Sequence, residues 1–149
     1  MTTTKEQLSQ ALKNAMRAQD DVRKRTVRMA LAAIKNAEID KQAELDEPAV
    51  YAILQKEVKA RRETIEGAQQ AGRDDLIAEA EAEIAVLDEF LPQSLTSEEL
   101  EAIVSETITA VGAASMREMG AVMQAVMPKV QGRADGKEVN QIVRRLLSS

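Results

Sequence analysis

The chain has 149 residues, enough for one domain or for two small ones. It contains neither cysteine nor histidine, which excludes disulfides, thiolate catalysis and conventional zinc or iron–sulfur sites. Its net charge of −5 argues against a protein that coats nucleic acid indiscriminately. Aromatic residues make up 1% of the chain, while aliphatic residues and methionine dominate, and this composition favours helices over strands.

We therefore expect an all-α fold: an N-terminal helical bundle of about four helices over residues 1–92, followed by a smaller three-helix module over residues 93–149. Pro92 marks the boundary, because proline cannot prolong the helix that precedes it. The short loops among the first four helices suggest an up-and-down bundle.

The first helix is expected to begin at a capping box of Thr4 and Gln7 and to run to about Ala18. Asp20 and Asp21 favour a turn and the start of a second helix, because carboxylates suit the positive end of the helix dipole. The second helix has an apolar stripe at three-and-four spacing, formed by Val27, Ala30, Leu31, Ile34 and Ala37.

Asp46 and Pro48 predict the start of a third helix, and Gly72 predicts its end in a left-handed conformation. A fourth helix is expected to start at Asp74 or Asp75 and to reach Leu91.

In the C-terminal module, a capping box of Thr96 and Glu99 predicts a helix that Gly112 ends. Similar patterns predict the next two helices: Ser115 with Glu118, and Asp135 with Glu138. The first of these two helices carries a methionine stripe, formed by Met116, Met119, Met123 and Met127. We favour core packing for this stripe over a partner groove. Pro128 is expected to bend this helix or to end its regular pattern of backbone hydrogen bonds before Val130.

Five acidic residues of the fourth helix are the remaining candidates for acid–base or magnesium chemistry: Glu79, Glu81, Glu83, Asp88 and Glu89. A solvated helix face is the preferred interpretation, because the inward positions of this helix are aliphatic. We predict no catalytic residue, no metal site and no cofactor. No stretch is long and apolar enough for a membrane span or a signal peptide, so we expect a cytoplasmic protein without a membrane partner.

The best candidate for binding an anion lies between the last two predicted helices. Lys129, Arg133 and Lys137 flank or occupy a loop with Gly132 and Gly136. Glycines allow close backbone approach, and the following helix N-terminus favours a phosphate. Such a contact would position a nucleic acid without reading its sequence. A tight interhelical loop explains the same residues equally well.

A second group of cations lies on the second and third predicted helices: Arg23, Arg25, Arg28, Lys56 and Lys59. Arg61 and Arg62 continue this group on the third helix. Ion pairing with acidic neighbours such as Glu57 and Glu63 is the favoured interpretation. An RNA-binding patch is the alternative.

Several motifs resemble those of the GatB/YqeY family, in particular of its stand-alone YqeY-like members. The motifs are Leu31-Ala-Ala-Ile-Lys-Asn-Ala-Glu-Ile-Asp40, Leu54-Gln-Lys-Glu-Val-Lys59, Ala82-Glu-Ile-Ala-Val-Leu87, Leu91-Pro92, Met119-Gly120-x-Val122-Met123 and Pro128-Lys129-x-x-Gly132-Arg133-Ala134-Asp135-Gly136. The resemblance covers nearly the whole chain. It implies similarity to the tail domain of the B subunit of tRNA-dependent amidotransferases, and it adds Arg144 to the tRNA-contact candidates.

Three functional hypotheses follow. The leading one is an accessory module that binds tRNA or other RNA by charge and shape without catalysis. The second is an adaptor that docks on an aminoacyl-tRNA-processing protein or other translation machinery. The third is participation in carbon–nitrogen ligation with glutamine as amido donor, for which the chain offers no visible nucleophile or base.

Overall fold

A computed structural model describes residues 2–148, and all regular structure in this range is helical, which confirms the all-α fold class. The chain divides into two compact units, residues 1–92 and residues 93–149. The first unit contains α1 (Thr4–Ala18), α2 (Asp21–Lys41), α3 (Glu47–Ala71) and α4 (Asp74–Asp88). The second contains α5 (Ser97–Val111), the 3₁₀ helix η1 (Met116–Glu118), α6 (Met119–Val130) and α7 (Gly136–Ser148).

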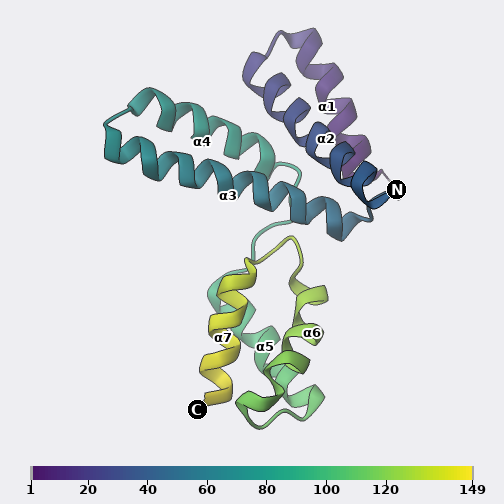
Figure 1. The fold of residues 1–149 in the computed structure, drawn as a ribbon, viewed down its shortest axis with the longest axis vertical. Coiled ribbons are helices and arrows are strands. Elements are labelled where there is room, and N and C mark those ends of the chain that lie inside the picture. The colour runs from purple at the N-terminus through teal and green to yellow at the C-terminus, as the bar shows by residue number, and fades with distance from the viewer. Residues whose placement is uncertain (1, 149) are drawn as a thin grey trace. The chain divides into compact units, whose positions relative to one another are not determined.

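The first unit consists of two helical hairpins, α1–α2 and α3–α4, which cross each other (Figure 1). This differs from the nearly parallel helices of an up-and-down bundle. The reason lies in α3, whose large buried aliphatic residues, Val50, Leu54 and Val58, all belong to its first half. These residues pack against the first hairpin, while α3 as a whole packs most extensively along α4.

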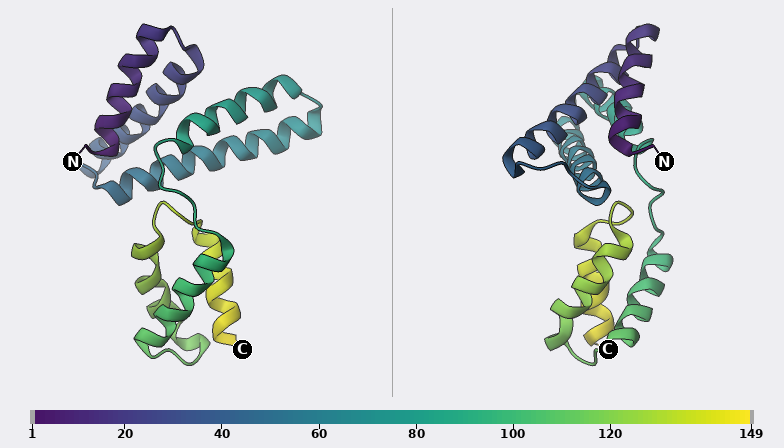
Figure 2. Two further views of the ribbon diagram at one scale, coloured as in Figure 1. Left: turned by 180° about the vertical axis from the view of Figure 1, so that it is seen from behind. Right: turned by 90° about the vertical axis from the view of Figure 1, so that its right-hand side faces the viewer.

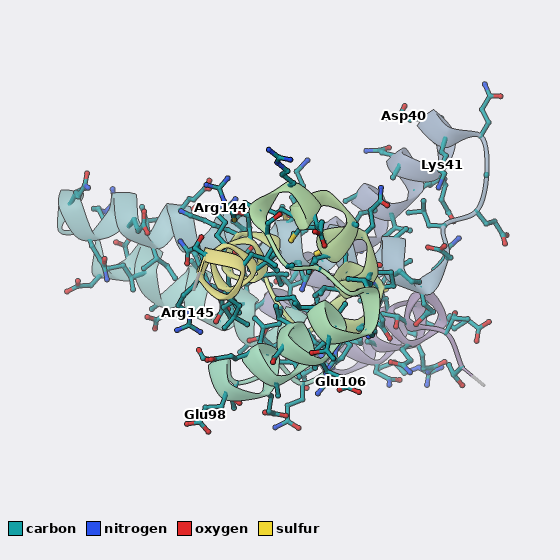
Figure 3. All side chains as sticks on the ribbon, turned by 90° about the horizontal axis from the view of Figure 1, so that it is seen from below. Asp40, Lys41, Glu98, Glu106, Arg144 and Arg145 are labelled. Atoms are coloured by element: carbon teal, nitrogen blue, oxygen red, sulfur yellow. The ribbon has the colours of Figure 1, made fainter. Side chains whose placement is uncertain are left out.

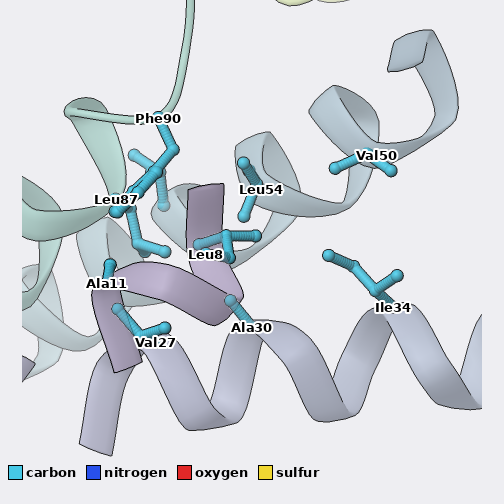
Figure 4. Packing of buried hydrophobic residues seen from close by; sticks show 10 residues of the cluster. Leu8, Ala11, Val27, Ala30, Ile34, Val50, Leu54, Leu87 and Phe90 are labelled. Atoms are coloured by element: carbon cyan, nitrogen blue, oxygen red, sulfur yellow. The ribbon is translucent and has the colours of Figure 1, made fainter. Parts of the chain in front are cut away.

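The core of the first unit forms where the two hairpins meet (Figure 4). Its largest fully buried side chains are those of Leu8, Val27, Ile34, Val50, Leu54 and Leu87. Burying one such side chain contributes about 1.5–3 kcal/mol, so this junction of hairpins is the main source of stability in the unit.

The start of α1 differs from the prediction by one residue. Thr3 and Glu6, rather than Thr4 and Gln7, form the capping box. Thr4 is buried, and its hydroxyl donates to Glu47 Oε2 at 2.8 Å while its amide donates to Glu47 Oε1 at 3.0 Å. The hydroxyl of Thr4 therefore ties the start of α1 to the start of α3 and does not serve as a cap.

In the second unit, α5, α6 and α7 surround a separate core (Figure 2). The core is aliphatic and includes Leu100, Val104, Val122, Val126, Val130, Val139 and Val143. Met119, Met123 and Met127 pack against it, while Met116 is 42% exposed. The methionine stripe is thus mainly core. α6 continues through Pro128 to Val130, although the proline ring removes one amide from the helical ladder.

The predicted capping box at Ser115 is absent. The side chain of Ser115 makes no capping hydrogen bond, and Glu118 Oε2 instead accepts the amide of Ala114 at 3.0 Å. The chain therefore enters α6 through one turn of 3₁₀ helix.

Candidate nucleic-acid interface

The loop between α6 and α7 holds the segment that precedes α5. Gly132 is buried and has a φ of 81°, a left-handed conformation that suits glycine. The next residue, Arg133, accepts the amide of Leu95 at its carbonyl oxygen, at 2.8 Å. Its side-chain Nε donates to the carbonyl oxygen of Gln93 at 3.0 Å. Gly132 and Arg133 therefore have a structural role inside the second unit.

Lys129 and Asp135 also make internal contacts. The Nζ of Lys129 donates to the hydroxyl of Thr107 at 3.0 Å, and this buried hydroxyl donates to the carbonyl oxygen of Ile103 at 2.7 Å. Asp135 Oδ1 accepts the amide of Lys137 at 3.2 Å, at the start of α7. A carboxylate thus lies where a phosphate at this helix N-terminus would bind. These contacts favour the tight-loop interpretation of residues 129–135 over a phosphate cradle.

Lys137 and Arg144 differ from the loop residues. Both are exposed, and neither side chain makes a hydrogen bond or ion pair within residues 2–148. They are seven positions apart on α7, so both lie on one face of the helix, with Gln141 between them. Val139, Val143 and Leu147 occupy the opposite, buried face. We call Lys137, Gln141 and Arg144 the outer face of α7.

A third side of α7 is directed toward α5. Glu138 Oε1 accepts the hydroxyl of Ser97 at 3.3 Å, and Arg145 forms an ion pair with Glu101 at 2.8 Å. Figure 3 shows Arg144 and Arg145 on different sides of the helix. Arg145 therefore has an acidic partner, whereas Arg144 has none in the described residues.

The acidic residues of the second unit gather on α5, which carries Glu98, Glu99, Glu101 and Glu106. Figure 3 shows Glu98 and Glu106 along this helix. The amide and hydroxyl of Thr96 hold the pKa of Glu99 below its usual value, so this cap remains ionised. Four of the acids of the second unit thus lie on α5, while Asp135 and Glu138 lie at the start of α7, close to Lys137.

The basic group of the first unit is divided by its ion pairs. Arg23 pairs with Glu89 and lies 5.8 Å from the ring centroid of Phe90. Arg25 pairs with Glu79 at 2.8 Å and with Glu83 at 3.2 Å. Three further cations of this group are exposed and lack such pairs in the part of the chain that the structure describes: Arg28, Lys56 and Lys59.

Arg61 has a structural role: it pairs with Glu57, as the sequence predicted, and also with Glu83, which the sequence did not indicate. The residue is only 6% exposed. Its Nε donates to Glu83 Oε2 at 2.8 Å, and its Nη1 donates to Glu57 Oε2 at 3.1 Å. Because Glu83 also binds Arg25, this network joins α2, α3 and α4. The Glu57–Arg61 spacing of four residues was a signal for part of this network.

A polar groove of about 510 Å³ lies between the start of α1, the end of α2 and the loop before α3. Lys5 pairs with Glu38 across it at 2.8 Å, and the other oxygen of Glu38 accepts the amide of Leu45 at 3.0 Å. Both contacts lower the pKa of Glu38. No group of three or more acidic side chains in residues 2–148 is placed to hold a metal ion.

The family described as Yqey-like protein matches residues 5–147 of this chain. Among curated relatives, a protein of Eremothecium gossypii is 44% identical over 85 residues, which are 56% of this chain and 46% of the relative. One of Lachancea thermotolerans is 41% identical over 105 residues, covering 68% of this chain and 56% of the relative. A protein of Pyrenophora tritici-repentis is 28% identical over 141 residues, which are 93% of this chain and 77% of the relative. The chain spans about half the length of the first two.

All three relatives are named "Altered inheritance of mitochondria protein 41, mitochondrial". These names contradict the predicted cytoplasmic location, because they assign the relatives to mitochondria. Nothing in the composition of the chain had signalled this. None of the helices in residues 2–148 has the length and apolarity that crossing a bilayer requires.

Proposed function

This chain belongs to the Yqey-like protein family, and on that basis we propose that it is an accessory RNA-binding module that contacts tRNA by charge and shape. The module performs no catalysis of its own. The family resemblance of the motifs to the tail domain of tRNA-dependent amidotransferases motivates the choice of tRNA.

The observation that carries the proposal is the outer face of α7. Lys137 and Arg144 are exposed, lie on one side of the helix and have no acidic partner in the described residues. Cations without an internal partner keep their charge available for an anion. Phosphate contacts of this kind position a nucleic acid and carry no sequence information.

The negative charge of the rest of the molecule limits the affinity for RNA. The net charge is −5, and several cations outside this face, such as Arg25, Arg73 and Arg145, are paired with carboxylates. Repulsion between these carboxylates and RNA opposes binding, and salt screens both attraction and repulsion. We therefore expect weak binding.

Fluorescence anisotropy with labelled bulk tRNA, repeated across a series of salt concentrations, tests this proposal. The expected result is saturable binding at low salt, with an affinity that falls as salt rises. A chain that shows no saturable binding to tRNA at low ionic strength would not be an RNA-binding module.

A protein-interaction adaptor is the second candidate function. Two large apolar side chains of α2 favour it, Met29 at 47% and Ile39 at 62% exposure. Its partner would be an aminoacyl-tRNA-processing protein or another component of translation. Affinity capture from lysate with and without nuclease distinguishes the two functions. A partner retained after nuclease treatment supports the adaptor, whereas a partner released by nuclease supports the RNA-binding module.

A further inference from the structure

We infer that the RNA segment bound by α7 is a base-paired stem, held through its backbone and not through stacked bases. This inference rests on the proposed function and specifies the form of RNA that the site accepts. Two observations support it: the arrangement of charge on α7, and the distribution of aromatic residues in the chain.

The two cations of the outer face are carried by one straight helix. Lys137 and Arg144 are two helical turns apart, which separates their Cα atoms by about 10 Å along the axis. Val139, Val143 and Leu147 anchor the helix in the core, so the two Cα atoms keep their spacing when a ligand binds. A duplex presents its phosphates at regular positions to these two cations, whereas a flexible strand must also be ordered, at a cost in conformational entropy.

Gln141 lies between the two cations and is exposed. Its amide both donates and accepts hydrogen bonds, as a ribose 2′-hydroxyl does. The minor groove of a paired RNA stem is wide and shallow and displays 2′-hydroxyls beside the phosphates. The order cation, amide, cation along the outer face of α7 therefore matches the chemistry of that groove.

The second unit offers little to an unpaired base. Residues 93–149 include no aromatic residue, since the aromatic residues of the chain are Tyr51 and Phe90. Proteins that bind single strands stack bases on aromatic side chains, with a gain of about 1–3 kcal/mol per base. On the outer face of α7 only the guanidinium plane of Arg144 is suited to stacking. A single strand would therefore gain almost no stacking energy here.

The test uses three labelled probes: bulk tRNA, an RNA hairpin with a fully paired stem, and an unstructured RNA of equal length. Their anisotropy is measured with the full chain, with K137E/R144E and with R145Q. R145Q is the control, because it removes a cation from the same helix on the side that contacts Glu101. Circular dichroism checks that each variant keeps its helical content.

We expect the hairpin to bind at least tenfold more tightly than the unstructured RNA. K137E/R144E should weaken hairpin binding by tenfold or more, while R145Q should stay within about threefold of the parent chain. The slope of log affinity against log salt should become shallower by about one for each phosphate that the variant no longer neutralises.

Equal or tighter binding of the unstructured RNA would overturn the inference and leave RNA binding itself intact. Unchanged hairpin binding by K137E/R144E would show that the RNA does not bind to the outer face of α7. If none of the three probes binds, including tRNA, the proposed function fails and the inference fails with it.

Discussion

At the scale of single residues, Arg61 shows how one buried charge fixes the packing of three helices. Its guanidinium binds Glu83 and Glu57, and Glu83 also binds Arg25. Removing one partner of a buried ion pair is costly, because the remaining charge keeps its desolvation penalty. We expect R61L to lower the free energy of unfolding by about 3 kcal/mol, as measured by urea denaturation.

The matched control for this prediction is R62L, which removes the neighbouring exposed arginine. An exposed cation without an ion pair contributes little, so R62L should change stability by less than about 0.5 kcal/mol. Equal effects of R61L and R62L would show that the network of Arg61 does not stabilise the first unit.

Thr26 carries a different kind of polar group. The residue is fully buried in α2, and its hydroxyl is the buried side-chain group in residues 2–148 that has no hydrogen-bond partner. An unpaired buried hydroxyl costs free energy, and valine has nearly the same shape. T26V should therefore raise the free energy of unfolding by about 1 kcal/mol. A loss of stability would mean that the hydroxyl is satisfied in solution.

At the scale of elements, the Lys5–Glu38 pair joins the start of α1 to the end of α2. The folded state lowers the pKa of Glu38 from its ordinary value of 4.5, so folding favours the ionised carboxylate. The resulting stabilisation is complete above pH 4.5 and is lost as pH falls through the lowered pKa. E38Q should therefore be less stable than the parent chain at pH 7, and the difference should shrink on acidification.

Thermal unfolding of both proteins between pH 7 and pH 2 measures this effect. E44Q serves as the control, because Glu44 lines the same groove but is exposed and makes no ion pair in the described residues. A stability difference between E38Q and the parent chain that does not depend on pH would contradict the assigned role of Glu38.

Most helix boundaries were predictable, because their signals are local. Asp20, Asp46 and Thr96 accept the amides expected of N-caps, and Gly72 and Gly112 adopt the left-handed conformation that ends a helix. The ends of α1 and α2 were less visible, since Gln19 and Gln42 adopt that conformation without being glycine or asparagine. The capping box was misplaced because consecutive threonines compete, and distant Glu47 engages Thr4.

The candidate site was less predictable than the helices, because its contacts are long-range. Lys129 and Arg133 resemble free cations in the sequence, but their partners are the hydroxyl of Thr107 and the carbonyl oxygen of Gln93. No local pattern indicates either contact. Lys137 and Arg144 were identified as candidates from the sequence and the family resemblance. They share one helix face because α7 begins at Gly136 and therefore includes Lys137.

At the scale of the whole molecule, the chain is an acidic helical protein without cysteine or histidine. The chain therefore lacks the thiolate nucleophile and the imidazole base that many enzymes use. We expect the purified chain, supplied with glutamine, ATP and mischarged tRNA, to produce no amidated aminoacyl-tRNA. Acid hydrolysis and chromatography of the tRNA-bound amino acid measures this. Amidation by the chain alone would establish it as an enzyme.

The most direct test of the central claim is a titration of the ¹⁵N-labelled chain with tRNA at low salt, followed by amide chemical shifts. We predict that the largest changes occur on α7, at and around Lys137, Gln141 and Arg144, and that they reverse when salt is added. Changes confined to the first unit, or no changes at saturating tRNA, would contradict the claim that the outer face of α7 binds RNA.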